Sequence, residues 1–168
     1  MAVLIADTSG VVSLAVAAET DPDPLSLTLD RYDVFLPETV VGELRDIASY
    51  DDGHGAAARA VLDRANYTVR AVDLDAEFPL DDGENAAVTL ANETDAELLL
   101  CDEFNSLGLV HASLADTRLV TTPTLLSVLS RTGGLSAGDA EGVLDEISAA
   151  RSWEANSYVA RARSLLER

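Results

Sequence analysis

The chain has 168 residues and a formal net charge of −19 at pH 7, with 30 acidic side chains against eleven basic ones, all of which are arginine. Hydrophobic residues make up 48% of the sequence, which is enough for the core of about one domain and excludes a disordered acidic tail. The single cysteine excludes an intramolecular disulfide and a cysteine-based zinc cluster, and no apolar run reaches the roughly 18 residues that span a bilayer.

The acidic residues are spread along the whole chain, and this composition resembles that of proteins from salt-loving archaea. In about 1 M salt the Debye length is ~3 Å, so most of the charge would be screened there. The acidity therefore does not exclude a nucleic-acid substrate, although no basic patch argues for one. No basic segment precedes the first apolar run, so we expect no signal peptide, no membrane partner and a cytoplasmic protein.

The chain begins with a pattern of strand, turn and helix. Residues 2–6 form an all-apolar run typical of a strand that is buried on both faces, and residues 11–18 predict a helix after the DTSG turn. Asp23 and Pro24 then predict the start of a short helix. The apolar run at 33–37 predicts a second buried strand.

Two helices and a third strand follow. Apolar side chains at spacings of three and four predict a helix over 38–50, and a second helix is expected over 55–65. Residues 67–72 alternate with period two, as in a strand. The next predicted helix, over 83–93, can be capped by either Asp81 or Asp82.

The second half of the chain contains two more predicted strands, over 96–101 and 118–121, which are separated by a helix over 103–114. The remainder predicts three helices, over 124–131, 136–150 and 152–167. Strands that alternate with helices indicate a three-layer α/β/α fold with a parallel sheet of roughly five strands and a helical C-terminus. We expect a single domain over residues 1–168, with a core at about 1–130 and C-terminal helices at about 136–168.

Four carboxylates stand where separate segments of such a fold converge, because loops that follow parallel strands meet at one edge of the sheet. Each has an ordinary explanation: helix caps for two of them, a solvated helix position for the third and a partner of a helix dipole for the fourth. A single shared cause is more economical, and a hard divalent cation such as Mg²⁺ or Mn²⁺ takes such oxygen ligands. The chemistry that suits this site is phosphodiester hydrolysis. The four residues are Asp7, Glu43, Glu84 and Asp102.

The order and spacing of four segments resemble the PIN-domain nucleases over roughly the first 130 residues. The segments are DTSG, LPETVVGELRD, DDGENAAVTLAN and AELLLCDEFNS. The resemblance implies a PIN-like fold and an endoribonuclease that depends on Mg²⁺ or Mn²⁺ and acts on RNA. It also implies that the four acids are the catalytic residues and metal ligands, whether for one ion or two, and that Ser9 supports Asp7 through a hydrogen bond.

One position departs from the family pattern. Many relatives carry another aspartate a few residues after the fourth acid, and Asn105 stands near that place here. Asn105 can accept a hydrogen bond from a metal-bound water but cannot act as a base, so Asp82 or Glu103 would have to supply the missing charge. The resemblance further implies either a toxin with a protein antitoxin as partner or an RNA-processing enzyme, and a homodimer as the expected assembly.

One arginine, two histidines and two aromatic residues are further candidates for binding or structural roles. Arg45, one turn after Glu43, is the arginine best placed to grip a phosphate, with a surface ion pair as its alternative role. His54 and His111 lack metal-ligand spacing, so we interpret both as structural. Trp153 and Tyr158 are expected to begin the last helix and dock it to the domain.

Two other functions remain open at this point. A PIN-like domain that binds metal without cutting RNA would be an interaction module, and Asn105 favours it. A different α/β phosphohydrolase would use Asp7 as a nucleophile. That enzyme ranks last, because Ser9 replaces its second aspartate and the chain has no lysine to neutralise a phosphoryl intermediate.

Overall fold

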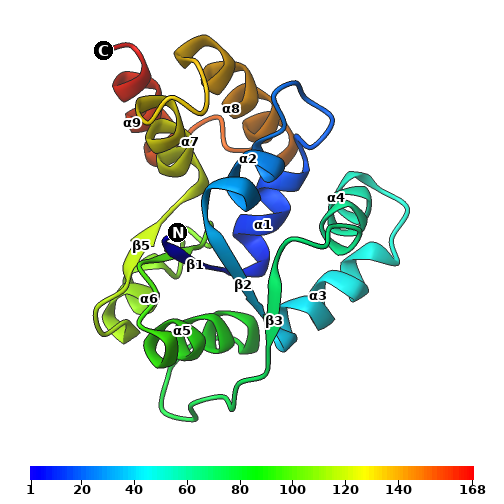
Figure 1. Cartoon of the computed structure of the whole chain (residues 1–168), viewed down its shortest axis with the longest axis vertical. Coiled ribbons are helices and arrows are strands. Elements are labelled where there is room, and N and C mark those ends of the chain that lie inside the picture. The colour runs from blue at the N-terminus through cyan, green and yellow to red at the C-terminus, as the bar shows by residue number, and fades with distance from the viewer.

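A five-stranded sheet organises the computed structural model, which describes residues 1–168 (Figure 1). All neighbouring strands are parallel, in the order β3-β2-β1-β4-β5. Ile5 of the central strand is paired with Phe35 on one side and Leu99 on the other. The strands are β1 (Val3–Ala6), β2 (Asp33–Pro37), β3 (Thr68–Arg70), β4 (Leu98–Leu100) and β5 (Arg118–Val120). The carboxyl ends of all five therefore lie at one edge.

Helices cover both faces of the sheet, which confirms the predicted three-layer α/β/α architecture (Figure 1). None of them has the length and apolarity needed to cross a membrane. The helices are α1 (Thr8–Ala15), α2 (Pro24–Arg31), α3 (Glu38–Ala48), α4 (Gly53–Leu62), α5 (Asp82–Thr94), α6 (Leu107–Ser113), α7 (Thr122–Arg131), α8 (Ala137–Arg151) and α9 (Ser157–Leu166).

The alternation of side chains along β1 divides the core into two clusters. Leu4 and Ala6 belong to a cluster that also contains side chains of α1 to α4 and α7 to α9. Ile5 points to the opposite face, where α5 and α6 supply the packing. Because β1 is the middle strand, both of its faces are covered, as its all-apolar sequence predicts.

Small and capping residues place the helices at the carboxyl edge. A Cβ atom on Gly10 would approach Leu100 Cγ to 2.6 Å, so glycine allows α1 to lie directly against the end of β4. Asp23 accepts hydrogen bonds from the backbone N–H groups of Leu25 and Ser26, as expected for a cap of α2. Of the two candidate caps for α5, Asp81 makes the capping bond.

Two predicted helix boundaries near the C-terminal half are wrong. Helix α6 begins at Leu107 and not at 103, so the residues after β4 form a loop. The last helix begins at Ser157, because α8 ends at Ser152 in a left-handed conformation and the chain reverses there. Trp153 consequently precedes α9 instead of lying inside it.

The C-terminal helices are docked by three aromatic rings. Trp153, only 7% exposed, meets the ring of Phe104 edge-on at 5.1 Å, and Tyr158 stacks on the same ring at 5.2 Å. Buried residues of α8 and α9 belong to the same core cluster as Leu4. A single domain stays a prediction, and this shared core supports it.

Candidate active site

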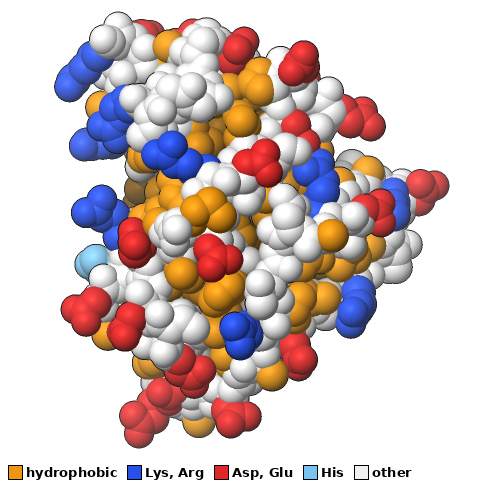
Figure 2. Space-filling model, in the orientation of Figure 1, with side chains coloured by type: hydrophobic (Ala, Val, Ile, Leu, Met, Phe, Trp, Pro, Cys, Tyr) orange, Lys and Arg blue, Asp and Glu red, His pale blue; other side chains and the backbone are white.

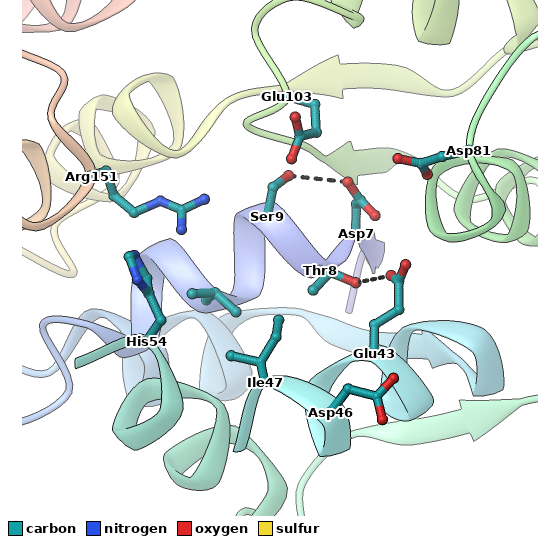
Figure 3. A pocket seen from close by; sticks show the side chains of 11 residues that line it. Asp7, Thr8, Ser9, Glu43, Asp46, Ile47, His54, Asp81, Glu103 and Arg151 are labelled. Atoms are coloured by element: carbon teal, nitrogen blue, oxygen red, sulfur yellow. Dashed lines mark hydrogen bonds between the residues drawn. The ribbon is translucent and has the colours of Figure 1, made fainter. Parts of the chain in front are cut away.

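A pocket of about 390 Å³ opens at the carboxyl edge of the sheet (Figure 3). Its lining comes from α1, α3 and α4, the cap of α5, the loop after β4, and the last turn of α8. Carboxylates are the most numerous side chains of this lining, which also contains one arginine, Arg151, and one histidine, His54. The carboxylates are Asp7, Glu43, Asp46, Asp81 and Glu103.

Asp7 lies at the end of β1, where its backbone N–H donates to the carbonyl of Leu100 at 2.9 Å. The side chain is only 3% exposed and makes no capping bond to α1, although Asp7 occupies the N-cap position. It accepts instead from Ser9 Oγ at 3.0 Å. Burial raises the pKa of Asp7 to about 7, against the opposing effect of these hydrogen bonds. The carboxylate is thus free of the ordinary capping role.

Ser9 connects the ends of the two central strands. Its hydroxyl donates to Asp7 Oδ2 and accepts from the backbone N–H of Asp102 at 2.9 Å. The serine is itself buried, so this short chain of hydrogen bonds fixes the orientation of the Asp7 carboxylate.

Glu43 reaches the pocket from the second turn of α3. Thr8 Oγ1 donates a short hydrogen bond to Glu43 Oε1, which ties α3 to the first turn of α1. Burial raises the pKa of Glu43, and the negative charges of Asp81 and Asp82 raise it further. The Glu43 carboxylate therefore faces other acids across the pocket (Figure 3).

Glu84 lies behind the pocket lining, in the first turn of α5. Its side chain is 6% exposed, and its Oε2 atom is buried without a hydrogen-bond partner. Burial raises the pKa of Glu84 to about 8, with additional contributions from the carboxylates of Asp81 and Asp7. An unpaired buried carboxylate oxygen beside other acids is costly unless a cation or a proton neutralises it.

Asp102 has a different environment, because both of its oxygens accept hydrogen bonds from one residue. Thr122, the first residue of α7, donates from its backbone N–H at 2.7 Å and from its hydroxyl. Asp102 is 4% exposed, and burial raises its pKa although these bonds oppose the rise. The carboxylate anchors α7 and does not line the pocket. Asp102 therefore does not cap the helix that directly follows it but binds the first residue of α7, whose N-cap is Thr121.

A family model described as a PIN domain matches residues 3–168. The chain belongs to the PIN-domain family. The match confirms the resemblance and continues past residue 130 through α8 and α9, farther than the sequence motifs indicate. PIN domains are generally nucleases and typically use divalent metals. No curated protein is significantly similar to this chain.

The structure of this PIN domain places some expected residues away from the pocket. Asn105 is exposed and does not line it, and neither does Arg45, which is exposed on α3. His54, interpreted as structural from the sequence, does line it. Arg151 and the carboxylate of Asp81 were missed as site residues. The only sequence signal for Asp81 was its capping position, and Arg151 had none.

The acids of the PIN domain fit a cation in their chemistry but not in their present positions. In their present positions, no three Asp, Glu, His or Cys side chains are arranged to hold one metal ion. The donor chemistry nevertheless fits a hard cation: the buried groups near Asp7 are carboxylates, and Glu84 Oε2 lacks a partner.

Proposed function

We propose that this PIN domain is an endoribonuclease that hydrolyses RNA phosphodiester bonds with the aid of Mg²⁺ or Mn²⁺. The observation that carries the proposal is the unpaired Oε2 atom of Glu84, buried near Asp7 behind a pocket of carboxylates. Packed acids repel one another, and a divalent cation both removes that penalty and suits phosphodiester chemistry. The pocket is open at the sheet edge, where α/β folds bind their ligands.

In this proposal Asp7, Glu43 and Glu84 hold the cation. A bound cation would activate water and stabilise the charge that develops on the phosphate. Ser9 and Thr8 orient the Asp7 and Glu43 carboxylates through the hydrogen bonds described above. Asp102, the fourth predicted ligand, acts in this proposal by fixing α7 and the Ser9 hydroxyl, because its carboxylate is bound to Thr122 and does not line the pocket.

The exposed carboxylates of Asp81 and Glu103 have supporting roles in this proposal. Asp81 and Glu103 line the pocket near Glu84, and both raise its pKa. They supply the charge that the family pattern places near Asn105, by accepting hydrogen bonds from water in the pocket. The family resemblance extends the proposal to a toxin with a protein antitoxin or to an RNA-processing nuclease, acting in either case as a homodimer in a salt-rich cytoplasm.

The test is cleavage of an end-labelled single-stranded RNA in molar KCl, with Mn²⁺, with Mg²⁺ and with excess EDTA. Wild type is compared with Asp7→Asn and with Asp30→Asn, which removes an exposed carboxylate from α2. We expect metal-dependent cutting that falls at least about 100-fold in Asp7→Asn and is unchanged in Asp30→Asn. Equal cutting by Asp7→Asn, or none by the wild type with either metal, would contradict the proposal.

A second function is favoured by one specific observation, the engagement of both Asp102 oxygens by Thr122. With that carboxylate committed to α7, the domain would bind a cation weakly and serve as an interaction module without cutting RNA. Calorimetry with Mn²⁺ on the same preparations separates the two functions. Metal binding that depends on Glu84, together with intact RNA, would establish the module.

A further inference from the structure

The charged groups of the pocket are separated into two ends. In Figure 3 the guanidinium of Arg151 points into the pocket from one side, with His54 next to it, and the carboxylates of Asp7, Glu43 and Asp81 occupy the other side. This separation places a guanidinium, a group that can bind phosphate, opposite the acids. A pocket lined only by carboxylates would repel a polyanion. The positive guanidinium at one end allows a phosphate to bind there.

Arg151 has no partner among the many acids of the chain. The ion pairs of the structure are Arg64 with Asp23 and Arg163 with Asp145, and Arg151 makes neither an ion pair nor a side-chain hydrogen bond. An arginine with 30 carboxylates in the same chain and none within 4 Å has its donors available. The planar guanidinium matches a phosphate through two parallel hydrogen bonds.

The position of Arg151 is fixed by the packing of its neighbours. It lies in the last turn of α8, and Trp153 two residues later is buried against Phe104. Phe104 directly follows Glu103, which lines the same pocket. The end of α8 is thus docked onto the loop that carries pocket residues, which gives the backbone at Arg151 a defined place relative to the acids.

The acidic residues are distributed unevenly along the chain. Residues 1–117 contain 24 of the 30 acidic residues and five of the eleven arginines, so residues 118–168 hold six of each and are neutral. Figure 2 shows basic side chains gathered over the upper left of the molecule, where α7 and α9 lie. The part of the chain that carries Arg151 is therefore neutral and repels a polyanion less than the acidic part does.

We propose that Arg151, with His54 beside it, binds a backbone phosphate next to the one that is cleaved and so fixes the path along which single-stranded RNA crosses the pocket. This inference rests on the proposed nuclease function, because the acids define the opposite end. A strand held at Arg151 and cut beside Asp7 would cross the pocket from its basic end to its acidic end. The arginine is a substrate-binding residue and takes no part in holding the cation.

A purely structural role for Arg151 makes a different prediction. Its positive charge lowers the pKa of buried Asp102, so the residue could act only by stabilising that carboxylate. In that case Arg151→Ala would lower the melting temperature while RNA affinity in the folded protein stayed the same.

The experiment compares Arg151→Ala, Arg151→Lys and His54→Ala with Arg31→Ala. Arg31 is exposed at the end of α2, just before β2 begins, and so lies at the edge of the sheet opposite the pocket. KM and kcat are measured on a single-stranded RNA, and the Kd of the same RNA is measured by fluorescence anisotropy in an Asp7→Asn background without divalent metal. Each measurement is repeated across a series of KCl concentrations, and melting temperatures are recorded.

We expect Arg151→Ala to raise KM and Kd about tenfold and to reduce the slope of log K against log salt by about 0.7, the value for one phosphate contact on a single strand. Arg151→Lys should recover part of the affinity, His54→Ala should have a smaller effect, and Arg31→Ala should match the wild type. Unchanged Kd and salt slope in Arg151→Ala, or an equal loss in Arg31→Ala, would overturn the inference.

The outcomes also separate this inference from the nuclease proposal. If the wild type cuts RNA and Arg151→Ala leaves KM unchanged, the inference is wrong and the nuclease remains. If the wild type binds RNA through Arg151 without cutting it, the nuclease proposal is wrong and the phosphate site remains. If the wild type neither binds nor cuts RNA, both are wrong.

Discussion

Gly83 lies directly against the carboxylate of Glu43, so a Cβ atom at position 83 would overlap Glu43 Oε1. The same oxygen accepts a hydrogen bond from Thr8. The first turn of α5 and the side chain from α3 can meet at the pocket because residue 83 has no side chain. Glycine at position 83 therefore leaves the space that the Glu43 carboxylate occupies.

Gly83→Ala should displace the Glu43 carboxylate. The Glu43 carboxylate is the end of a flexible side chain and can move aside, so we expect little change in unfolding free energy, whereas RNA cleavage should fall at least about tenfold because a proposed ligand is displaced. Gly142→Ala is the matched control, because nothing lies within 4 Å of a Cβ added there, in the exposed middle of α8. That change should stabilise the protein by about 0.5–1 kcal/mol. Chemical denaturation and the cleavage assay give both quantities, and undiminished cleavage by Gly83→Ala would contradict the expected displacement of Glu43.

The sequence was sufficient for the sheet and for the strands and helices that carry or precede the four acids, because these elements are local patterns. It did not reveal that Asp102 faces Thr122, since that contact joins residues 20 apart through the packing of α7. Arg151 could not be found either. Its place in the pocket depends on the docking of Trp153 against Phe104, which brings together segments about 50 residues apart.

Asp7 should make the stability of the metal-free protein depend on pH. Its pKa is about 7 in the folded protein against 3.8 for the free side chain, chiefly because it is buried. Since the folded-state pKa is the higher one, the stability from this group is complete below pH of about 3.8 and is lost as the pH rises through about 7. Asp7→Asn removes the loss, so without divalent cations it should exceed the wild type near pH 8 by up to about 4 kcal/mol.

The measurement is thermal or urea unfolding of both proteins in EDTA across this pH range, with Asp30→Asn as the control. The advantage of Asp7→Asn should shrink toward pH of about 4, where the wild-type carboxyl is protonated. A difference that is constant with pH would show that the buried charge is not its cause.

The bond between Asp102 and Thr122 should contribute to stability more than to chemistry. Thr122→Val keeps the shape of the side chain and leaves Asp102 without the hydroxyl donor, so we expect a loss of about 1–3 kcal/mol. Thr132→Val is the control, because its exposed hydroxyl only donates to backbone carbonyls at the end of α7. Urea unfolding measures both variants. A loss in Thr132→Val as large as that in Thr122→Val would argue against a special role for Asp102.

Removal of the Trp153 side chain, which docks the end of α8, should affect both stability and RNA affinity. Trp153→Ala leaves a cavity beside Phe104 and should cost about 3–5 kcal/mol. Because Trp153 positions the end of α8, RNA affinity of the remaining folded protein should fall toward that of Arg151→Ala. Tyr50→Ala, at an aromatic residue that is 64% exposed, should change neither quantity. Normal RNA affinity in a folded Trp153→Ala would separate the docking of α8 from RNA binding.

A divalent cation should stabilise the folded protein through Glu84. We expect Mn²⁺ to raise the melting temperature, and to raise it more near pH 8 than near pH 6, because burial and neighbouring acids hold protons on Asp7 and Glu84 that the cation must displace. Glu84→Gln should abolish most of this rise. Glu93→Gln, which changes an exposed carboxylate on the same helix, should retain it. Calorimetric titration with Mn²⁺ checks the same pair of variants. Equal Mn²⁺ affinity in Glu84→Gln and the wild type would mean that the unpaired oxygen of Glu84 does not hold the cation.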